Sequence, residues 1–375
     1  MATKTKISTS RTTLASQLSR KFIGHDVNLQ RLQADQRRTV FKALKKLEAK
    51  LVNKIAQHVG AETFTLERNR ALLRETRKVI QTAYDDIAQD HAEMLVDMGA
   101  FELEATAKVV NRNLGVDLFA VGVPRTVVES MLSENTVFGA PLQSYWAQQS
   151  ASLQAKFAVE MRAGVFAGET TGQLIQRVRG TKKNQFQDGL MQTTRRGAEV
   201  VVRTSAQSIL NDARMAVFQA NADVIDGVQA QATLDDRTSD ICMARSGFAW
   251  TLDGDPMPGT DTDETFPGPP PWHPNCRTTL MPVVKSVGDI IGDKSIDTQI
   301  RKEVEKLPKA TQASMTGQVA GHLTYEEWLR DQSKAVQLSV LGPGRLALWE
   351  KGDISLRDLI DQRGNPLTLK ELQKL

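Results

Sequence analysis

The chain has 375 residues, of which 40% are hydrophobic and 25% charged, and its net charge is +4. This length exceeds what one hydrophobic core usually serves, so we expect two or three structural units. The cysteine count and the apolar runs favour a cytosol-like compartment, for the following reasons. Two cysteines are too few for a disulfide framework, and no apolar run approaches the roughly 20 residues that span a bilayer, which excludes disulfide-rich secreted and membrane-spanning proteins.

Residues 1–25 have the composition of a disordered basic arm. Residues 1–21 contain nine Ser or Thr and no acid, and such a segment buries too little apolar surface to offset its chain entropy. Its basic residues are Lys4, Lys6, Arg11, Arg20 and Lys21. Basic side chains on a flexible arm release counterions from phosphates, so a polyanion partner is favoured over a solvated tail without one.

Residues 26–165 predict a helical hairpin or bundle. Apolar residues at the spacing of one helix face are Val40, Leu44, Leu47, Leu51 and Ile55. Lysines largely off that face, which we expect to contact a polyanion, are Lys42, Lys45, Lys46 and Lys50. A second pattern repeats every seven residues from Leu66 to Met94. Because a short connection around Gly60 separates the two patterns, packing as an antiparallel hairpin is favoured over a coiled coil with another chain.

Residues 166–285 predict a small α+β domain. Helices are expected over 171–179 and 188–220, and the apolar period then changes to two from Val228, which is typical of a strand. A second strand is expected over 278–284, broken by Pro282. The segment between them is crowded with proline and acid, which indicates an exposed, extended loop.

Both cysteines and one histidine lie between these strands. His273 and Cys276 have the spacing of half a zinc site, and strand pairing would bring Cys242 near as a third ligand. Candidates for a fourth ligand are Asp236, Asp235, Asp240 and His322. Three interpretations stay open: a structural zinc, a cysteine hydrolase with His273 as base, and a loop fastened by hydrogen bonds and packing. Fastening of the loop, with or without a metal, is favoured.

Residues 286–375 predict a C-terminal helical docking segment. Three Ser/Thr-x-x-acid patterns begin at Thr324, Ser355 and Thr368, and each predicts the start of a short helix. Apolar anchors available for a partner are Tyr325, Trp328, Leu346 and Trp349. The chain is therefore expected to be mainly α, with a long N-terminal helical hairpin, a small α+β central domain and short C-terminal helices.

Two segments, in this order, carry a resemblance to a known family. In the first, Val202-Arg203-Thr204 and Asn211-Asp-Ala-Arg214 precede ATLDDRTSDIC and PPWHPNCRTTLMPV; the second is the ending over about residues 323–372. Together they resemble the Mu F-like minor head, or head morphogenesis, family of tailed bacteriophages. Relatives often read HPNCRC, whereas Thr278 replaces the last cysteine here, which weakens the case for zinc or shifts a ligand to an aspartate.

The resemblance implies a minor capsid protein without catalytic activity. It would be bound to the portal protein inside the head, with major capsid or scaffold protein as further candidate partners, and made in the host cytoplasm without need of a membrane. It would aid head assembly and DNA packaging or ejection through non-specific DNA contact. The alternatives are a cysteine/histidine-dependent hydrolase and a cytosolic DNA-binding protein, for which the sequence offers no recognition helix.

Overall fold

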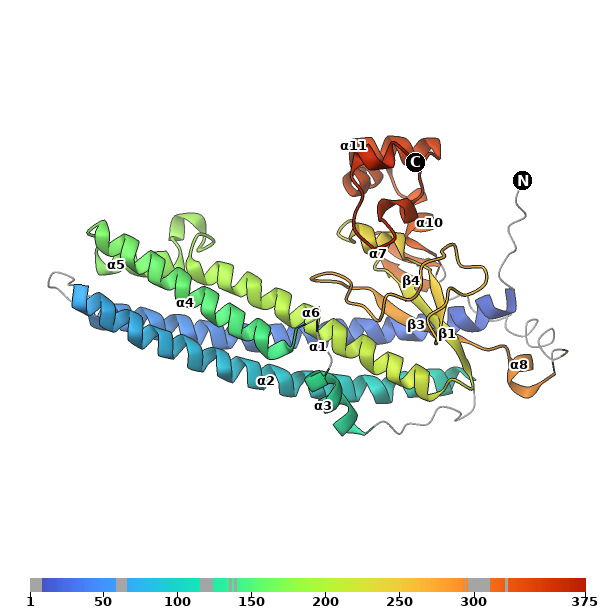
Figure 1. The fold of residues 1–375 in the computed structure, drawn as a ribbon, viewed down its shortest axis with the longest axis horizontal. Helices are drawn as coiled ribbons and strands as arrows, with labels where there is room; N and C mark the ends of the chain where they lie inside the picture. Colours follow the sequence, from blue (N-terminus) through green and yellow to red (C-terminus); the bar gives the residue numbers. More distant parts are fainter. Residues whose placement is uncertain are drawn as a thin grey trace. The chain divides into compact units, whose positions relative to one another are not determined.

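The computed structural model describes residues 9–58, 66–114, 124–134, 140–293, 311–320 and 323–375, together with residues 137 and 295 (Figure 1). It divides into two compact units. One, the helical unit, comprises residues 30–98 and 126–209. The other, the sheet unit, holds the described parts of residues 1–29, 99–125 and 210–375. Three long helices, α1 (Thr9–His58), α2 (Leu66–Leu114) and α6 (Leu190–Ala220), contribute to both units.

In the helical unit, α1 and α2 form the antiparallel hairpin that the apolar spacing predicted. The Gln36 side chain donates to the Met94 carbonyl oxygen at 3.1 Å, and Lys54 Nζ lies 2.8 Å from Glu75, so the two helices run in opposite directions. The predicted α1 stripe is buried, with each member at most 2% exposed: Val40, Leu44, Leu47, Leu51 and Ile55.

Further helices complete this unit. They are α3 (Arg125–Glu134), α4 (Leu142–Phe166), α5 (Thr171–Arg179) and a 3-10 turn, η1 (Lys182–Asn184). Helix α5 begins and ends where the sequence predicted, and its start is a capping box in which Thr170 and Gln173 bond each other's backbone. Helix α4 buries Trp146, whose indole N–H donates to His91 Nδ1 on α2 at 3.2 Å.

The start of α1 corrects one expectation. The helix begins at Thr9, so the backbone of residues 9–25 is helical where composition predicted a disordered arm. Tertiary contact supplies a reason: His25 is buried, and its Nε2 lies 2.5 Å from Glu102 Oε2 on α2. Residues 1–8, with Lys4 and Lys6, lie outside the described residues, as do the side chains of Arg11, Arg20 and Lys21.

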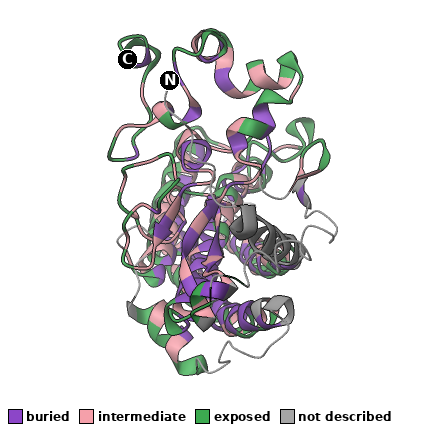
Figure 2. Ribbon diagram, turned by 90° about the vertical axis from the view of Figure 1, so that its right-hand side faces the viewer, coloured by how far each residue is buried: buried purple, intermediate pink, exposed green. Residues whose placement is uncertain are grey.

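The sheet unit is built on a three-stranded antiparallel sheet of β1 (Ile225–Gln231), β2 (Ala249–Thr251) and β3 (Thr279–Val284), in the order β2-β1-β3. The strands consist mainly of buried and half-buried residues (Figure 2). Two of them, β1 and β3, confirm the predicted strands, and Pro282 is tolerated because β3 is an edge strand, where a missing N–H costs no ladder bond. Gly227 allows β2 to approach, since a Cβ there would lie 2.1 Å from the Trp250 carbonyl oxygen.

Side chains of α6 fasten that helix to β3. Asn211 donates to the Thr278 carbonyl oxygen at 3.3 Å and accepts from the Leu280 amide at 3.1 Å. Arg214 donates to the Leu280 carbonyl oxygen at 3.4 Å, and its Nε donates to Glu102 Oε1 at 2.5 Å. Burial raises the pKa of Glu102, but Arg214 and His25 lower it by more, so the carboxylate stays ionised inside the core.

The C-terminal part contains further short elements. They are α7 (Asp240–Ala244), α8 (Val287–Ile291), the hairpin β4 (Thr311–Ser314) and β5 (Gly317–Ala320), α10 (Tyr325–Arg330), α11 (Lys334–Lys351), η2 (Leu356–Leu359) and α12 (Leu369–Leu372). All three predicted capping boxes are present, at Thr324, Ser355 and Thr368. No helix in the described ranges is both long and apolar enough to cross a membrane.

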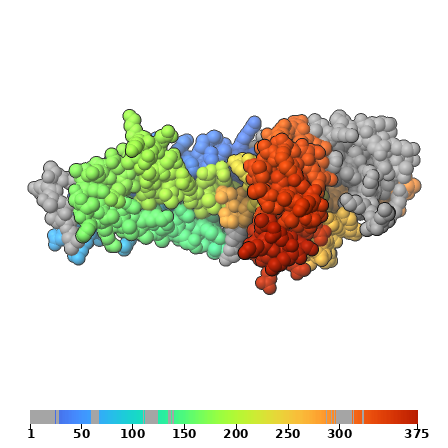
Figure 3. All heavy atoms as spheres, turned by 90° about the horizontal axis from the view of Figure 1, so that it is seen from above, coloured from blue at the N-terminus to red at the C-terminus, as the bar shows by residue number. Residues whose placement is uncertain are grey.

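The four expected docking anchors are core residues instead. Tyr325 and Trp328 are fully buried, and Leu346 and Trp349 are each 3% exposed. They pack in one cluster with Leu234, next to β1, and with Met243 of α7. Residues 323–375 therefore form one body with the preceding domain rather than a separate segment from residue 286, and they gather in one group on the molecule, red in Figure 3. Aromatic side chains so placed are not available to a partner.

Candidate metal centre

Three potential metal ligands meet at one end of the sheet. Because Gln231, the last residue of β1, pairs with Thr279, the first of β3, the segments that follow β1 and precede β3 leave the sheet at the same end. The first of these segments forms α7, which carries Cys242, and the second is the turn that contains His273 and Cys276. Strand pairing thus brings together residues 31 to 34 positions apart, as the sequence predicted.

The ligand atoms of these residues lie within 4.8 Å of one another. The Cys242 sulfur is 3.6 Å from the Cys276 sulfur and 3.1 Å from His273 Nε2. Both cysteines are free thiols and 2% exposed, while the histidine is half-buried. Such a set of soft donors is typical of a zinc site.

Hydrogen bonds orient the His273 ring. Its Nδ1 lies 2.8 Å from the Pro274 carbonyl oxygen, which can only accept, so Nδ1 carries the hydrogen and Nε2 faces Cys242 and the Ser239 hydroxyl, 2.8 Å away. The turn is closed by the Cys276 amide, which donates to the His273 carbonyl oxygen at 3.1 Å. Asn275 adopts a φ of 61° there, a left-handed conformation that asparagine tolerates well. A carbonyl acceptor on the far nitrogen is the usual support of a metal-binding histidine.

Charge in the cluster is concentrated on one sulfur. The hydrogen bond from Cys242 and the neighbouring His273 lower the pKa of Cys276 to about 4, against the effect of burial. Conversely, the hydrogen bond to Cys276 and burial raise the pKa of Cys242 above its usual range. Burial lowers the pKa of His273, but the Cys276 thiolate raises it by more. The cluster therefore holds one thiolate, on Cys276, as a ready ligand for a cation.

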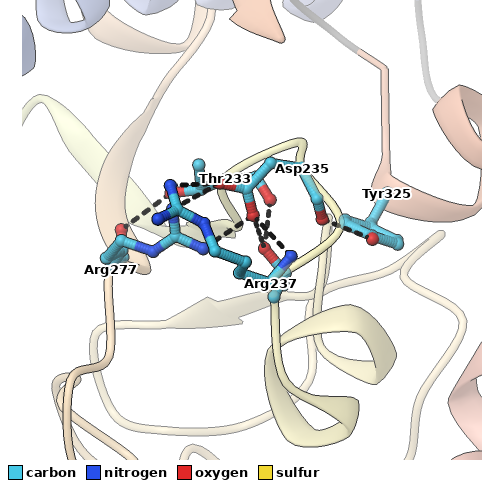
Figure 4. A network of polar contacts seen from close by, with 6 residues as sticks. Thr233, Asp235, Arg237, Arg277 and Tyr325 are labelled. Carbon is cyan, nitrogen blue, oxygen red and sulfur yellow. Dashed lines mark hydrogen bonds and ion pairs between the residues drawn. The ribbon is translucent and has the colours of Figure 1, made fainter. Parts of the chain in front are cut away.

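An ion pair beside the cluster fastens the loop. Both Arg277 Nη atoms donate to the carboxylate of Asp235, at 2.5 and 2.7 Å (Figure 4). The Arg237 amide donates to the same carboxylate at 3.1 Å, and the Tyr325 hydroxyl donates to the Asp235 carbonyl oxygen at 2.7 Å. Burial raises the pKa of Asp235, but Arg277 lowers it by more. Asp235 thus joins the loop after β1, the start of β3 and α10.

None of the acids expected as fourth ligand joins the cluster. Asp236 is exposed and is not in the group of converging ligand atoms. Asp235 binds Arg277, and Asp240 binds Arg345 at 2.7 Å. His322 lies outside the described residues.

Two hydroxyl residues that sequence reasoning missed stand there instead. Ser239, the N-cap of α7, contacts His273, and the buried Thr278 lines the same pocket as Cys242. Only the departure from HPNCRC pointed to Thr278. A polar pocket opens beside the cluster, lined by Thr233, Arg237, Thr238, Ser239, Cys242, His273, Asn275, Arg277 and Thr278.

The expected polyanion contacts lie on α1 of the helical unit. Lys42, Lys45, Lys46 and Lys50 are all exposed, and in the described part of the chain no ion pair involves them. Basic residues of α5 and α6 differ, because Arg179 and Arg195 both bind Glu48 and Arg177 binds Glu160 and Glu169. The α1 lysines are thus the less neutralised of the two basic groups.

Comparison with known families gives one match. Residues 155–281 match the family described as phage Mu protein F like protein, a range that includes the end of α4, all of α5 and α6, strands β1 and β2, the start of β3 and the Cys-His-Cys cluster. Comparisons with curated proteins and with solved structures gave no match. The matched range agrees with the first of the two segments on which the resemblance was based. Over residues 155–281 the chain is therefore similar to the phage Mu protein F like family.

Proposed function

We propose that the protein is a minor capsid protein of a tailed bacteriophage that acts in head morphogenesis at the portal vertex, inside the head. The match over residues 155–281 carries this proposal. The motif residues have a structural task, since Asn211 and Arg214 tie α6 to β3. Because residues 323–375 share a core with this region, the sheet unit would dock on the portal as one body, with capsid or scaffold protein as further contacts.

The test is purification of portal from heads assembled in host cytoplasm. We expect this protein to co-purify with portal in a fixed ratio and to be protected from added protease in closed heads. A control variant is Arg357→Ala, which removes an exposed ion pair with Asp261. Because such a pair contributes little to stability, this variant should fold and enter heads like the unaltered protein. Heads that contain portal but never this protein would contradict the proposal.

The second part of the proposal is non-specific contact with packaged DNA. The exposed lysines of α1, with the basic residues of segment 1–21, would release counterions from phosphates. Replacing Lys42, Lys45, Lys46 and Lys50 with Ala should make the salt dependence shallower. The negative slope of log affinity against log salt should decrease in magnitude by up to about 0.9 for each lysine that contacts a phosphate.

The matched control changes the same charge elsewhere. Four exposed lysines of the C-terminal part serve: Lys334, Lys351, Lys370 and Lys374. Their Ala variant should keep the slope of the unaltered protein, measured on two unrelated duplexes. Equal slopes for both variants would reject the α1 surface, and a strong preference for one duplex would favour the sequence-specific DNA-binding alternative.

We further propose that Cys242, His273 and Cys276 bind a structural zinc. Zinc–sulfur bonds of about 2.3 Å and zinc–nitrogen bonds of about 2.0 Å in a tetrahedron place ligand atoms on the order of 3.5 Å apart. The 3.6 and 3.1 Å separations here fit that geometry. The metal would crosslink α7 to the turn before β3. Elemental analysis of purified protein should show near-stoichiometric zinc that Cys276→Ser loses; absence of zinc from the unaltered protein would reject it.

The role proposed for the cluster is structural and not catalytic. A thiolate next to a histidine is also what a cysteine hydrolase needs, but Cys276 is 2% exposed and does not line the pocket. Cys276→Ala should therefore lower the melting temperature and incorporation into heads. Loss of a hydrolytic turnover with unchanged stability would instead support the hydrolase.

A further inference from the structure

The two cysteines of the cluster are close enough to react with each other. Their sulfur atoms are 3.6 Å apart, and a disulfide bond is about 2 Å long, so closure requires the two sulfurs to approach by roughly 1.6 Å. Cys242 lies on α7, Cys276 lies in the turn before β3, and both are free. They also pack in one small buried cluster with Ala232.

The pocket makes the two sulfurs unequal toward a reagent from solution. Cys242 lines the pocket together with Ser239 and Thr238, whereas Cys276 does not line it. A small molecule that enters the pocket therefore meets Cys242 and not Cys276. In this arrangement Cys242 can form a mixed disulfide with the reagent, and Cys276 can resolve it.

We propose that Cys242 and Cys276 form a reversible disulfide by exchange with a small-molecule disulfide such as oxidised glutathione. The hydrogen of Cys242 passes to the Cys276 thiolate along the contact between the two sulfurs, and the Cys242 sulfur attacks one sulfur of oxidised glutathione. The S–S bond of glutathione breaks, and one glutathione leaves as a thiolate. The Cys276 sulfur then attacks Cys242 in the mixed disulfide, and the second glutathione leaves with the hydrogen of Cys276. The protein loses two electrons and one proton, which reduce one glutathione disulfide to one thiol and one thiolate.

The bond would change what the cluster can do. It would link α7 covalently to the turn before β3, residues 34 positions apart, and would consume two of the three proposed zinc ligands, so oxidation and metal binding exclude each other. Its biological setting rests on the proposed function: a head protein is made in reducing cytoplasm and is carried into oxidising surroundings when particles are released.

The test uses the full-length, metal-free protein with glutathione buffers and mass spectrometry of the intact chain. We expect a product lighter by two hydrogens in which neither thiol reacts with maleimide, restored by reduced glutathione. Cys276→Ser should stop at a glutathione adduct on Cys242, because no resolving thiol remains. Unaltered protein that keeps both thiols, or that accumulates the Cys242 adduct, would overturn the proposal.

Two further measurements separate the folded geometry from simple thiol chemistry. In unfolding urea the equilibrium constant for disulfide formation should fall, because the fold no longer holds the sulfurs together; an equal constant would overturn the proposal. Protein preloaded with zinc should oxidise more slowly than metal-free protein. Equal rates would count against the zinc and leave the disulfide standing, and neither result depends on a role in phage heads.

Discussion

Thr278 lies beside the Cys-His-Cys cluster, two residues after Cys276. It is buried and lines the same pocket as Cys242 and His273. Thr278→Cys would add a fourth soft ligand, and four-ligand closure is the norm for structural zinc. Changes to residues that only support metal ligands alter metal affinity by about 10- to 100-fold. Because Thr278→Cys adds a ligand, we expect zinc affinity to rise by at least about 10-fold.

Chelator competition measures this change. Thr278→Val is the matched control, because it keeps the shape of threonine without a donor and should not raise zinc affinity. If Thr278→Cys binds zinc no more tightly than the unaltered protein, the three residues do not form the metal site proposed here.

His91 predicts a pH dependence in the helical unit. Burial lowers its pKa to about 3, so the folded protein keeps it neutral, whereas the unfolded chain binds a proton below a pKa of about 6.5. Its contribution is complete above pH 6.5 and is lost as pH falls from there toward 3. At pH 5 this loss is about 2 kcal/mol.

Urea unfolding of His91→Gln at pH 7 and pH 5 isolates that contribution. Glutamine can accept the Trp146 N–H but does not titrate, so the stability gap between the two proteins should narrow by about 2 kcal/mol at pH 5. A gap that stays constant would show that His91 is protonated in the folded state as readily as in the unfolded one.

Among individual residues, sequence reasoning found the cluster but not its surroundings. Cys242, His273 and Cys276 could be joined because antiparallel strand pairing has a simple geometry. Nothing local reveals that Asp235 is paired with Arg277, 42 positions away, and is therefore lost as a ligand.

At the level of elements, α2, α6 and β3 are held by one buried ion pair. Glu102 and Arg214 are both fully buried, and Arg214 also bonds to Leu280 in β3. Arg214→Ala would leave the Glu102 carboxylate buried with its strongest partner removed, which costs about 3–5 kcal/mol. We expect unfolding of the sheet unit at correspondingly lower urea concentration.

Arg203→Ala is the control for this prediction. Arg203 lies on the same helix, but its side chain is 47% exposed in an ion pair with Glu199, so its removal should change stability by less than about 1 kcal/mol. Equal effects of the two substitutions would mean that the buried pair does not hold these elements together.

Element boundaries show the same division between local and distant causes. The α1 stripe and the capping boxes at Thr324, Ser355 and Thr368 were predictable, because spacing and caps act within a few residues. The start of α1 was not, since the Glu102 that pairs with His25 is 77 positions away in the chain.

For the molecule as a whole, the C-terminal residues complete a core. Ending the chain at residue 320 would expose Leu234 and Met243, which pack against Trp328 and its neighbours. Since burial of one such side chain is worth about 1.5–3 kcal/mol, we expect the shortened protein to be insoluble or to melt at markedly lower temperature.

Ending the chain at Leu372 instead removes only three exposed residues and should leave solubility and melting temperature unchanged. If the chain that ends at residue 320 were as stable as the complete one, residues 323–375 would be the separate docking segment that the sequence suggested.

The sequence by itself determined the long helices, strands β1 and β3, and which residues meet at the Cys-His-Cys cluster, because periodicity and caps act over short range and strand pairing has a simple geometry. Only the tertiary structure decided whether an apolar residue lies in the core of this chain or on its surface. Tyr325 and Trp349 read as docking anchors from composition, yet they are buried against a loop near β1, and the Tyr325 hydroxyl bonds Asp235, 90 positions earlier. Burial of an apolar side chain is favourable both in the core of its own chain and in an interface with a partner, because the hydrophobic effect has no direction. Only the fold therefore distinguishes a core residue from an interface residue.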